Sequence, residues 1–154
     1  ALIVHDRVLL GQLAEEIPET AEKLMAAFWP GPLTLLFQAR GTIPSALTAG
    51  TGKIGIRIPS HPFALLLAEA FGKPLTATSA NVSGEVEAVS AEDVRTIFED
   101  SVDLILDGGP VPGAEGSTVV DMTYSPPRQV RKGRIAFSRV LEVLGFSVTE
   151  AHDW

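Results

Sequence analysis

Hydrophobic and polar positions follow two periods along the chain, and proline and glycine separate the segments. Apolar residues at helical spacing predict helices, whereas short apolar runs between breakers predict strands. The pattern predicts helical segments over residues 19–29, 62–71, 90–100 and 136–146. It predicts strands over residues 1–6, 33–39, 53–59, 74–80, 102–107 and 117–122. This order predicts an α/β fold with a twisted, mixed parallel and antiparallel sheet and flanking helices.

The size and composition of the chain fit one globular domain. Of its 154 residues, 45% are hydrophobic and 20% are charged, so we expect a single domain over residues 1–154 with a buried core. The 19 acidic and 12 basic residues give a net charge of −7. Such a surface as a whole repels polyanions such as nucleic acid and anionic membrane, but it leaves room for a local basic groove.

Cysteine and histidine usage limits the chemistry. The chain has no cysteine, and its three histidines, His5, His61 and His152, lack the spacing of a zinc site. A metal ion would therefore have to arrive with a ligand. No apolar run reaches the ~20 residues of a membrane span, and no basic-then-apolar leader precedes Ala1. We expect a cytoplasmic protein with no membrane partner.

The segment from Pro74 to Glu85, PLTATSANVSGE, collects small polar side chains behind a strand-like start. Hydroxyl, amide and backbone N–H groups in such a loop are able to converge on phosphate or carboxylate oxygens. Serine, asparagine and glycine are also the ordinary residues of turns, and composition alone favours a plain turn.

Three further positions have two interpretations each. Arg57 lies between Ile56 and Ile58 in a run that looks buried, so it needs an anionic partner, which is either a ligand or a structural ion pair. His5 follows an apolar run, where a hydrogen-bonded core histidine is commoner than a ligand contact. Ser117 follows a glycine-rich loop that is either a lid or a simple connection.

Six motifs occur in the order and spacing of one family: FWPGPLTLLF, GKIGIRIPSHP, PLTATSANVSGE, DLILDGG, GSTVVD and VRKGRI. With them the chain resembles the YrdC-type threonylcarbamoyl-AMP synthase family over nearly its whole length. The resemblance implies a YrdC-like domain and a nucleotidyltransferase that condenses L-threonine, bicarbonate and ATP into threonylcarbamoyl-AMP and pyrophosphate. That product serves the t6A modification at position 37 of tRNA, which implies tRNA or proteins of the t6A pathway as further partners.

The resemblance implies two sets of contacts, carried over residue by residue: His5, Arg57, Ala77 and Ser117 for L-threonine, and Lys53, Ser79, Asn81 and Arg131 for ATP. Arg57 is suited to pair with the threonine carboxylate. None of these residues is an evident general base, so positioning and charge neutralisation would provide the catalysis. Magnesium is expected to accompany the ATP phosphates rather than to occupy a protein cage.

Several positions depart from the family's pattern. Glu87 and Val89 stand where the family usually has Ser, Pro and Thr, and Lys132 stands where Pro is usual. The family also has, ahead of the strand that corresponds to LIVH, a segment with a Lys-x-Arg pair for the triphosphate, and the sequence as given begins at Ala1 without it. We therefore expect weakened ATP handling and impaired catalysis by residues 1–154 alone.

Two other classes of function remain open. An RNA-binding YrdC-like module without catalysis is one, although the acidic excess argues against strong tRNA affinity. A carbamoyltransferase domain of the hydrogenase-maturation type is the other, because such domains share a related fold and a Ser-Ala-Asn loop. The WPGPLTL motif fits the threonine enzymes better.

Overall fold

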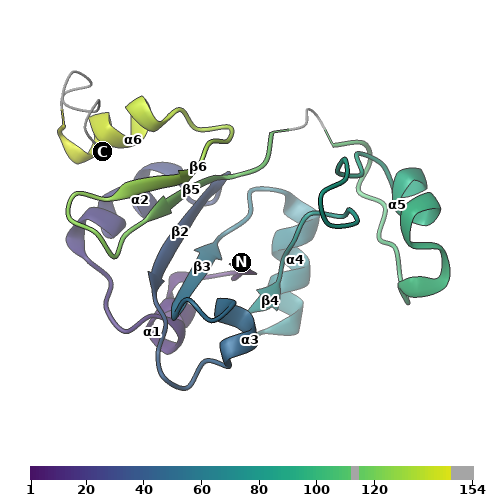
Figure 1. The fold of residues 1–154 in the computed structure, drawn as a ribbon, viewed down its shortest axis with the longest axis horizontal. Helices are drawn as coiled ribbons and strands as arrows, with labels where there is room; N and C mark the ends of the chain where they lie inside the picture. Colours follow the sequence, from purple (N-terminus) through teal and green to yellow (C-terminus); the bar gives the residue numbers. More distant parts are fainter. Residues whose placement is uncertain (112–114, 147–154) are drawn as a thin grey trace. The chain divides into compact units, whose positions relative to one another are not determined.

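The computed structural model describes residues 1–111 and 115–146 and divides into two compact units (Figure 1). The first unit is formed by Ala1–Thr76 and the chain from Gly116 onward, and the second by Ala77–Glu115. His152 and the middle of the glycine-rich loop before Ser117 lie outside the described residues. The single domain over residues 1–154 stays a prediction.

A mixed sheet of six strands, in the order β4-β1-β3-β2-β5-β6, forms the first unit. The strands are β1 (Leu2–Ile3), β2 (Leu33–Gln38), β3 (Lys53–Arg57), β4 (Leu75–Thr76), β5 (Thr118–Asp121) and β6 (Arg128–Arg131). β1 runs parallel to β3 and β2 runs parallel to β5, whereas the other neighbours are antiparallel. The predicted mixed sheet is therefore confirmed.

Helices cover one face of this sheet and enclose the core with it. The helical elements of the unit are the 3₁₀ helix η1 (Arg7–Leu9), α1 (Leu10–Leu13), α2 (Glu19–Phe28), α3 (Ser45–Thr48), α4 (Pro62–Phe71) and α6 (Phe137–Leu144). Leu10 of α1, Leu24 of α2 and Val140 of α6 are fully buried in one cluster with the sheet residues Leu35 and Ile56. Since side chains alternate along a strand, every second sheet residue faces away from this core.

The turn after α2 explains the Trp-Pro-Gly-Pro motif and sets the start of β2. Trp29 caps the helix, and its Nε1 donates to the carbonyl oxygen of Leu33 at 2.7 Å. A Cβ atom on Gly31 would lie 2.2 Å from the carbonyl oxygen of Phe28, so only glycine fits this turn. The turn thereby holds the beginning of β2, including the buried Thr34.

The second unit consists of the polar loop, α5 (Ala91–Phe98), the 3₁₀ helix η2 (Glu99–Ser101) and extended chain. Ser90 caps α5, because its hydroxyl accepts from the backbone N–H of Asp93 at 3.1 Å. The carboxylate of Asp93 accepts in turn from the N–H of Val89 at 3.0 Å. The bond from Val89, followed by hydrogen bonding between the Asp93 carboxylate and Ser90, lowers the pKa of Asp93. The Ser90 cap confirms the predicted helix start.

Three predicted strands differ in the structure, and the one predicted over residues 1–6 ends at Ile3. No strand forms over residues 102–107, where Val102, Leu104 and Leu106 are 37%, 72% and 46% exposed. The prediction of a buried strand was wrong there because no other strand of the described chain pairs with this segment. The strand predicted over 74–80 ends at Thr76. In residues 1–111 and 115–146, no helix combines the length and apolar character needed to cross a membrane.

Candidate anion-binding site

One row of residues crosses the sheet of the first unit on the face opposite the core. Strand pairing joins Thr34 of β2 to Val119 of β5, and Val119 to Arg131 of β6. The register of β2 with β3 brings Arg57 beside Thr34. Paired residues point to the same face of a sheet. We call Arg57, Thr34, Arg131 and Ser117, which directly precedes β5, the arginine row.

Hydrogen bonds connect three members of the arginine row. The hydroxyl oxygens of Thr34 and Ser117 lie 2.8 Å apart. Nη2 of Arg131 donates to the hydroxyl oxygen of Ser117 at 3.0 Å, and Nε and Nη2 of the same guanidinium donate to the carbonyl oxygen of Ser117 at 3.1 and 2.9 Å. Arg131 therefore fixes the chain at Ser117 and brings positive charge next to a buried hydroxyl.

Arg57 carries an uncompensated charge within the row. Its side chain is partly buried, and within the described chain its guanidinium has no hydrogen bond or ion pair. Burial, together with the positive charges of Arg131 and Arg134, lowers the pKa of Arg57. Arginine remains protonated even so, because its pKa starts far above neutrality. Cations held together in this way favour an anionic ligand, and a carboxylate suits the planar guanidinium.

His5 lies at the same end of β3 as Arg57. The backbone N–H of Val4 donates to the carbonyl oxygen of Arg57 at 3.0 Å, which ties the chain before His5 to the end of that strand. Nδ1 of His5 is buried and finds no hydrogen-bond partner among the described residues. For this ring nitrogen, the structure therefore does not support the interpretation of His5 as a hydrogen-bonded core histidine. A buried nitrogen without a partner fits a ligand contact.

The structure does not bring Lys53 together with Arg57. Lys53 begins β3 and Arg57 ends it, so about 13 Å of strand separates them at about 3.3 Å per residue. Nζ of Lys53 lies 2.7 Å from Oδ2 of Asp121 and 4.5 Å from the ring centre of Tyr124. The hydrogen bond to Asp121 raises the pKa of Lys53. The assignment of Lys53 to ATP stays a prediction, and its contacts show a structural ion pair.

The remaining candidates, Ala77, Ser79 and Asn81, lie together in the loop of the second unit. The side-chain nitrogen of Asn81 donates to the carbonyl oxygens of Val82 and Glu85 at 2.9 and 3.0 Å. This amide therefore holds a turn, as the composition of the loop favoured. Ser79 is exposed and Ala77 is partly buried. Their contacts with threonine and ATP stay predictions.

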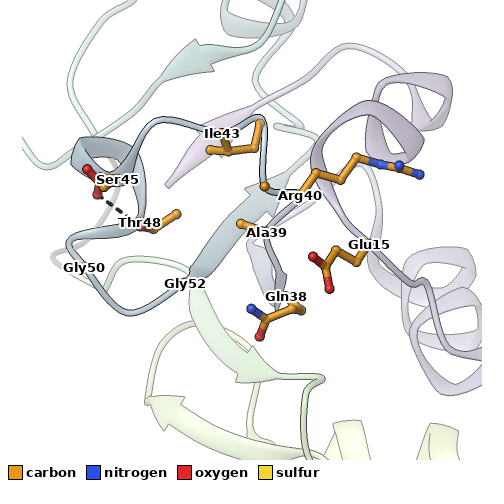
Figure 2. Close-up of a pocket in the computed structure, with 10 residues that line it drawn as sticks. Glu15, Gln38, Ala39, Arg40, Ile43, Ser45, Thr48, Gly50 and Gly52 are labelled. Atoms are coloured by element: carbon orange, nitrogen blue, oxygen red, sulfur yellow. Dashed lines mark hydrogen bonds between the residues drawn. The ribbon is translucent and has the colours of Figure 1, made fainter.

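A separate depression of about 380 Å³ lies where β2 and α3 end, and Figure 2 shows its lining. Its charged side chains are Glu15 and Arg40, and Gln38 contributes an amide. Gln38 pairs with Lys53, so the depression lies at the strand ends remote from the arginine row. None of the predicted site residues lines it.

Sequence reasoning missed three residues around the row: Thr34, Arg134 and Gly133. Thr34 was detectable as a polar residue inside the apolar run LTLLF. Gly133 packs so closely that a Cβ atom would lie 2.5 Å from the carbonyl oxygen of Gly116 and the backbone nitrogen of Thr118. The proximity of Arg134 to Arg57 depends on the pairing of β5 with β6 and has no local signal.

Fold and site together define an α/β protein with a cationic row, suited to an anion, on the sheet face opposite the core. A profile of the Sua5/YciO/YrdC family, described as "Telomere recombination", matches residues 1–133, and the chain belongs to this family. The threonylcarbamoyl-AMP synthase of Pyrococcus abyssi is 40% identical over 146 residues, which cover 94% of this chain and 43% of that protein.

Two solved structures resemble this one. Sua5 of P. abyssi complexed with L-threonine has a TM-score of 0.89 and 38% identity, and the match covers 94% of this chain and 42% of that one. YciO of E. coli has a TM-score of 0.81 and 31% identity, covering 91% of this chain and 68% of that one. The chain spans 43% and 61% of the length of the first two curated relatives it matches.

Proposed function

We propose that this protein is an L-threonylcarbamoyladenylate synthase, which makes threonylcarbamoyl-AMP and pyrophosphate from L-threonine, bicarbonate and ATP. The observation that carries the proposal is the partly buried Arg57 guanidinium, which has no partner within the described chain and lies beside Arg131. Such a group suits the carboxylate of an amino acid. Family membership and a similar protein that was solved with L-threonine support this choice of amino acid.

Four candidate residues of the first unit have a role in the proposed reaction. Arg57 pairs with the threonine carboxylate, and the buried Nδ1 of His5 offers a further polar contact at the same strand end. Ser117 donates from the floor of the row, and Arg131 balances the negative charge of the nucleotide. Ser79 and Asn81 of the second unit are the proposed adenylate contacts, and Ala77 leaves space for the amino acid.

The chemistry requires positioning more than proton transfer. The threonine amine and bicarbonate give a carbamate with loss of water. A carbamate oxygen then attacks the α-phosphorus of ATP, and pyrophosphate leaves. Both partners are anionic, so cations that reduce their repulsion and hold them in line lower the barrier. Arg131 is held in place before substrate arrives, because its guanidinium is already bound to Ser117.

Magnesium belongs to the nucleotide in this proposal. Within residues 1–111 and 115–146, no group of three or more His, Cys, Asp or Glu side chains could hold a metal ion. The row itself consists of guanidinium groups and neutral hydroxyls and has no carboxylate, the side chain that usually binds Mg²⁺ in proteins. Magnesium would therefore enter as Mg–ATP and neutralise phosphate charge. With tRNA as the eventual acceptor of the product, the proposal places the protein in the cytoplasm.

The test is product formation by the natural protein, with any segment ahead of Ala1 retained, because we expect impaired catalysis by residues 1–154 alone. With L-threonine, bicarbonate, Mg²⁺ and ATP, mass spectrometry should detect threonylcarbamoyl-AMP, and omission of any one substrate should abolish it. Absence of the product with all substrates present would contradict the proposal. Salt-dependent tRNA binding without product would favour an RNA-binding module. Nucleotide-dependent carbamoyl transfer without threonine would favour a carbamoyltransferase.

A further inference from the structure

We propose that Thr34 is a positioning residue that directs the hydroxyl proton of Ser117 toward the carboxylate of the amino-acid substrate. The inference rests on the proposed function for the identity of the substrate. The inference adds Thr34 of β2 to a site whose other residues lie on β3, directly before β5 and on β6. Thr34 itself contacts Ser117 and reaches the substrate only through it.

The burial of Thr34 limits where its hydroxyl group can donate. The residue is 3% exposed, and within the described chain the hydroxyl oxygen of Ser117, 2.8 Å away, is the only hydrogen-bond partner of its side chain. If Ser117 donated to Thr34, the proton of Thr34 would be buried without an acceptor, which is unfavourable. Thr34 is therefore the donor of this bond.

The hydroxyl proton of Ser117 has no acceptor among the described residues in this arrangement. A guanidinium can only donate, so the contact of 3.0 Å from Arg131 occupies one lone pair of the Ser117 oxygen, and Thr34 occupies the other. With Cβ and two accepted bonds in place, a roughly tetrahedral oxygen has one direction left for its own proton. Ser117, 8% exposed, lies nearer to solvent than Thr34 and can meet a ligand.

This arrangement makes Ser117 a fixed donor. A freely rotating serine hydroxyl serves as donor or acceptor, but here both acceptor positions are occupied within the protein. A donor in the same row as the Arg57 guanidinium matches a carboxylate, which only accepts. Thr34 thus contributes to selection of an anionic group. It also orders the Ser117 hydroxyl before the ligand binds, which reduces the entropy lost on binding.

Calorimetry of L-threonine binding to the full chain tests the inference. Thr34→Val keeps the shape but removes the donor, and it should weaken binding roughly three- to tenfold, the equivalent of one neutral hydrogen bond. Thr34→Ser restores a donor and should return affinity close to that of the wild type. Thr48→Val removes a buried hydroxyl that bonds the carbonyl of Ser45 in α3, and it should leave binding unchanged.

A double-mutant cycle separates positioning from a general structural role. If Thr34 acts through Ser117, Thr34→Val should change affinity by less than about twofold in a Ser117→Ala background. An equal loss in both backgrounds would overturn the inference. Unchanged or tighter binding by Thr34→Val alone would also overturn it, because that is expected when Ser117 is the donor of the pair.

Proton NMR of the protein without ligand decides the donor independently of threonine. The hydroxyl proton of Thr34 should exchange slowly, and Ser117→Ala should accelerate that exchange by removing its acceptor. Slow exchange of the Ser117 proton instead would overturn the inference. Failure of the wild type to bind L-threonine would contradict the proposed function, and the NMR result would still decide the direction of the hydrogen bond.

Discussion

Nζ of Lys53 lies 2.7 Å from the carboxylate of Asp121, at the opposite end of β3 from Arg57. The two cations of this strand are therefore in different situations. Lys53 is neutralised within the fold and stacks against Tyr124, whereas Arg57 has no such partner in the described chain. This contrast predicts a stabilising role for the Lys53 end of the strand and is consistent with the proposed ligand binding at the Arg57 end.

The first prediction concerns the stability of this ion pair. Asp121 is nearly buried and also accepts from the backbone and hydroxyl of Thr123. Asp121→Asn should lower the free energy of unfolding by about 1.5 to 3 kcal/mol, as for hydrogen bonds to charged groups. Glu19→Gln, which breaks an exposed ion pair with Lys23, is the control and should cost at most about 1 kcal/mol in urea unfolding.

The second prediction is the pH dependence of the difference in unfolding free energy between wild type and Asp121→Asn. Burial opposes the charge of Asp121, but hydrogen bonds from Lys53 and Thr123 outweigh it, so the pKa lies below its ordinary value. A lowered folded-state pKa gives stability that is present above the ordinary value of ~3.9 and is lost as pH falls through the lowered pKa. The gap between wild type and Asp121→Asn should therefore be constant near neutrality and shrink below about pH 4. A gap that widens in acid would contradict this.

The pKa of Lys53 determines how the same difference in unfolding free energy depends on pH in alkaline solution. It is raised, chiefly by Asp121, so its contribution is complete below the ordinary value of ~10.4 and is lost only as pH rises through the raised pKa. Unfolding measured at pH 8 and pH 10 should therefore show the same gap between wild type and Asp121→Asn.

The third prediction concerns close packing beside the arginine row. Gly133 is buried, and a Cβ atom there would lie 2.5 Å from backbone atoms of Gly116, Ser117 and Thr118. Gly133→Ala should destabilise the protein by about 1 to 3 kcal/mol through overpacking and should displace Ser117. Gly11→Ala, in an exposed position with nothing within 4 Å, is the control and should be neutral or stabilising. Equal melting temperatures for both variants would contradict this packing.

The sequence predicted those helices and strands that have a clear local pattern of apolar residues. The helices over 62–71 and 19–29 and the strands over 33–39, 53–59 and 117–122 appear in the structure within about two residues, the usual uncertainty of helix and strand ends. The short α1 and α3 were missed because four residues do not establish a period. The strand over 102–107 was predicted wrongly because an apolar run does not reveal whether a pairing strand exists.

The site was less predictable than the fold. Arg57 was detectable as a cation between two buried isoleucines, but its neighbours Arg131 and Thr34 approach it only through the pairing of distant strands. The family resemblance implied an ATP contact for Lys53 and a threonine contact for Arg57. The two residues share a face of β3 by alternation, but the length of the strand keeps them apart. By contrast, the composition of the polar loop favoured a plain turn, and the Asn81 amide holds one.

The fourth prediction separates Ser79 from Asn81. Ser79 is exposed, and its hydroxyl has no hydrogen bond within the described chain, so Ser79→Ala should leave the melting temperature unchanged. If it contacts the adenylate, formation of threonylcarbamoyl-AMP should fall about tenfold, the equivalent of one charge-assisted hydrogen bond. Ser83→Ala, another exposed serine of this loop, is the control and should retain activity. Equal activity of the two variants would remove Ser79 from the site.

The most direct test of the account is calorimetric titration of the full chain with L-threonine, comparing wild type, Arg57→Ala and Arg40→Ala. Both variants remove one positive charge, but Arg40 is exposed and lies beyond the far end of β2. The account predicts that Arg57→Ala weakens binding by about 2 to 4 kcal/mol, as for loss of a charged partner in a shielded site. Arg40→Ala should bind like the wild type. Wild-type affinity in Arg57→Ala would contradict the placement of the threonine carboxylate on the arginine row.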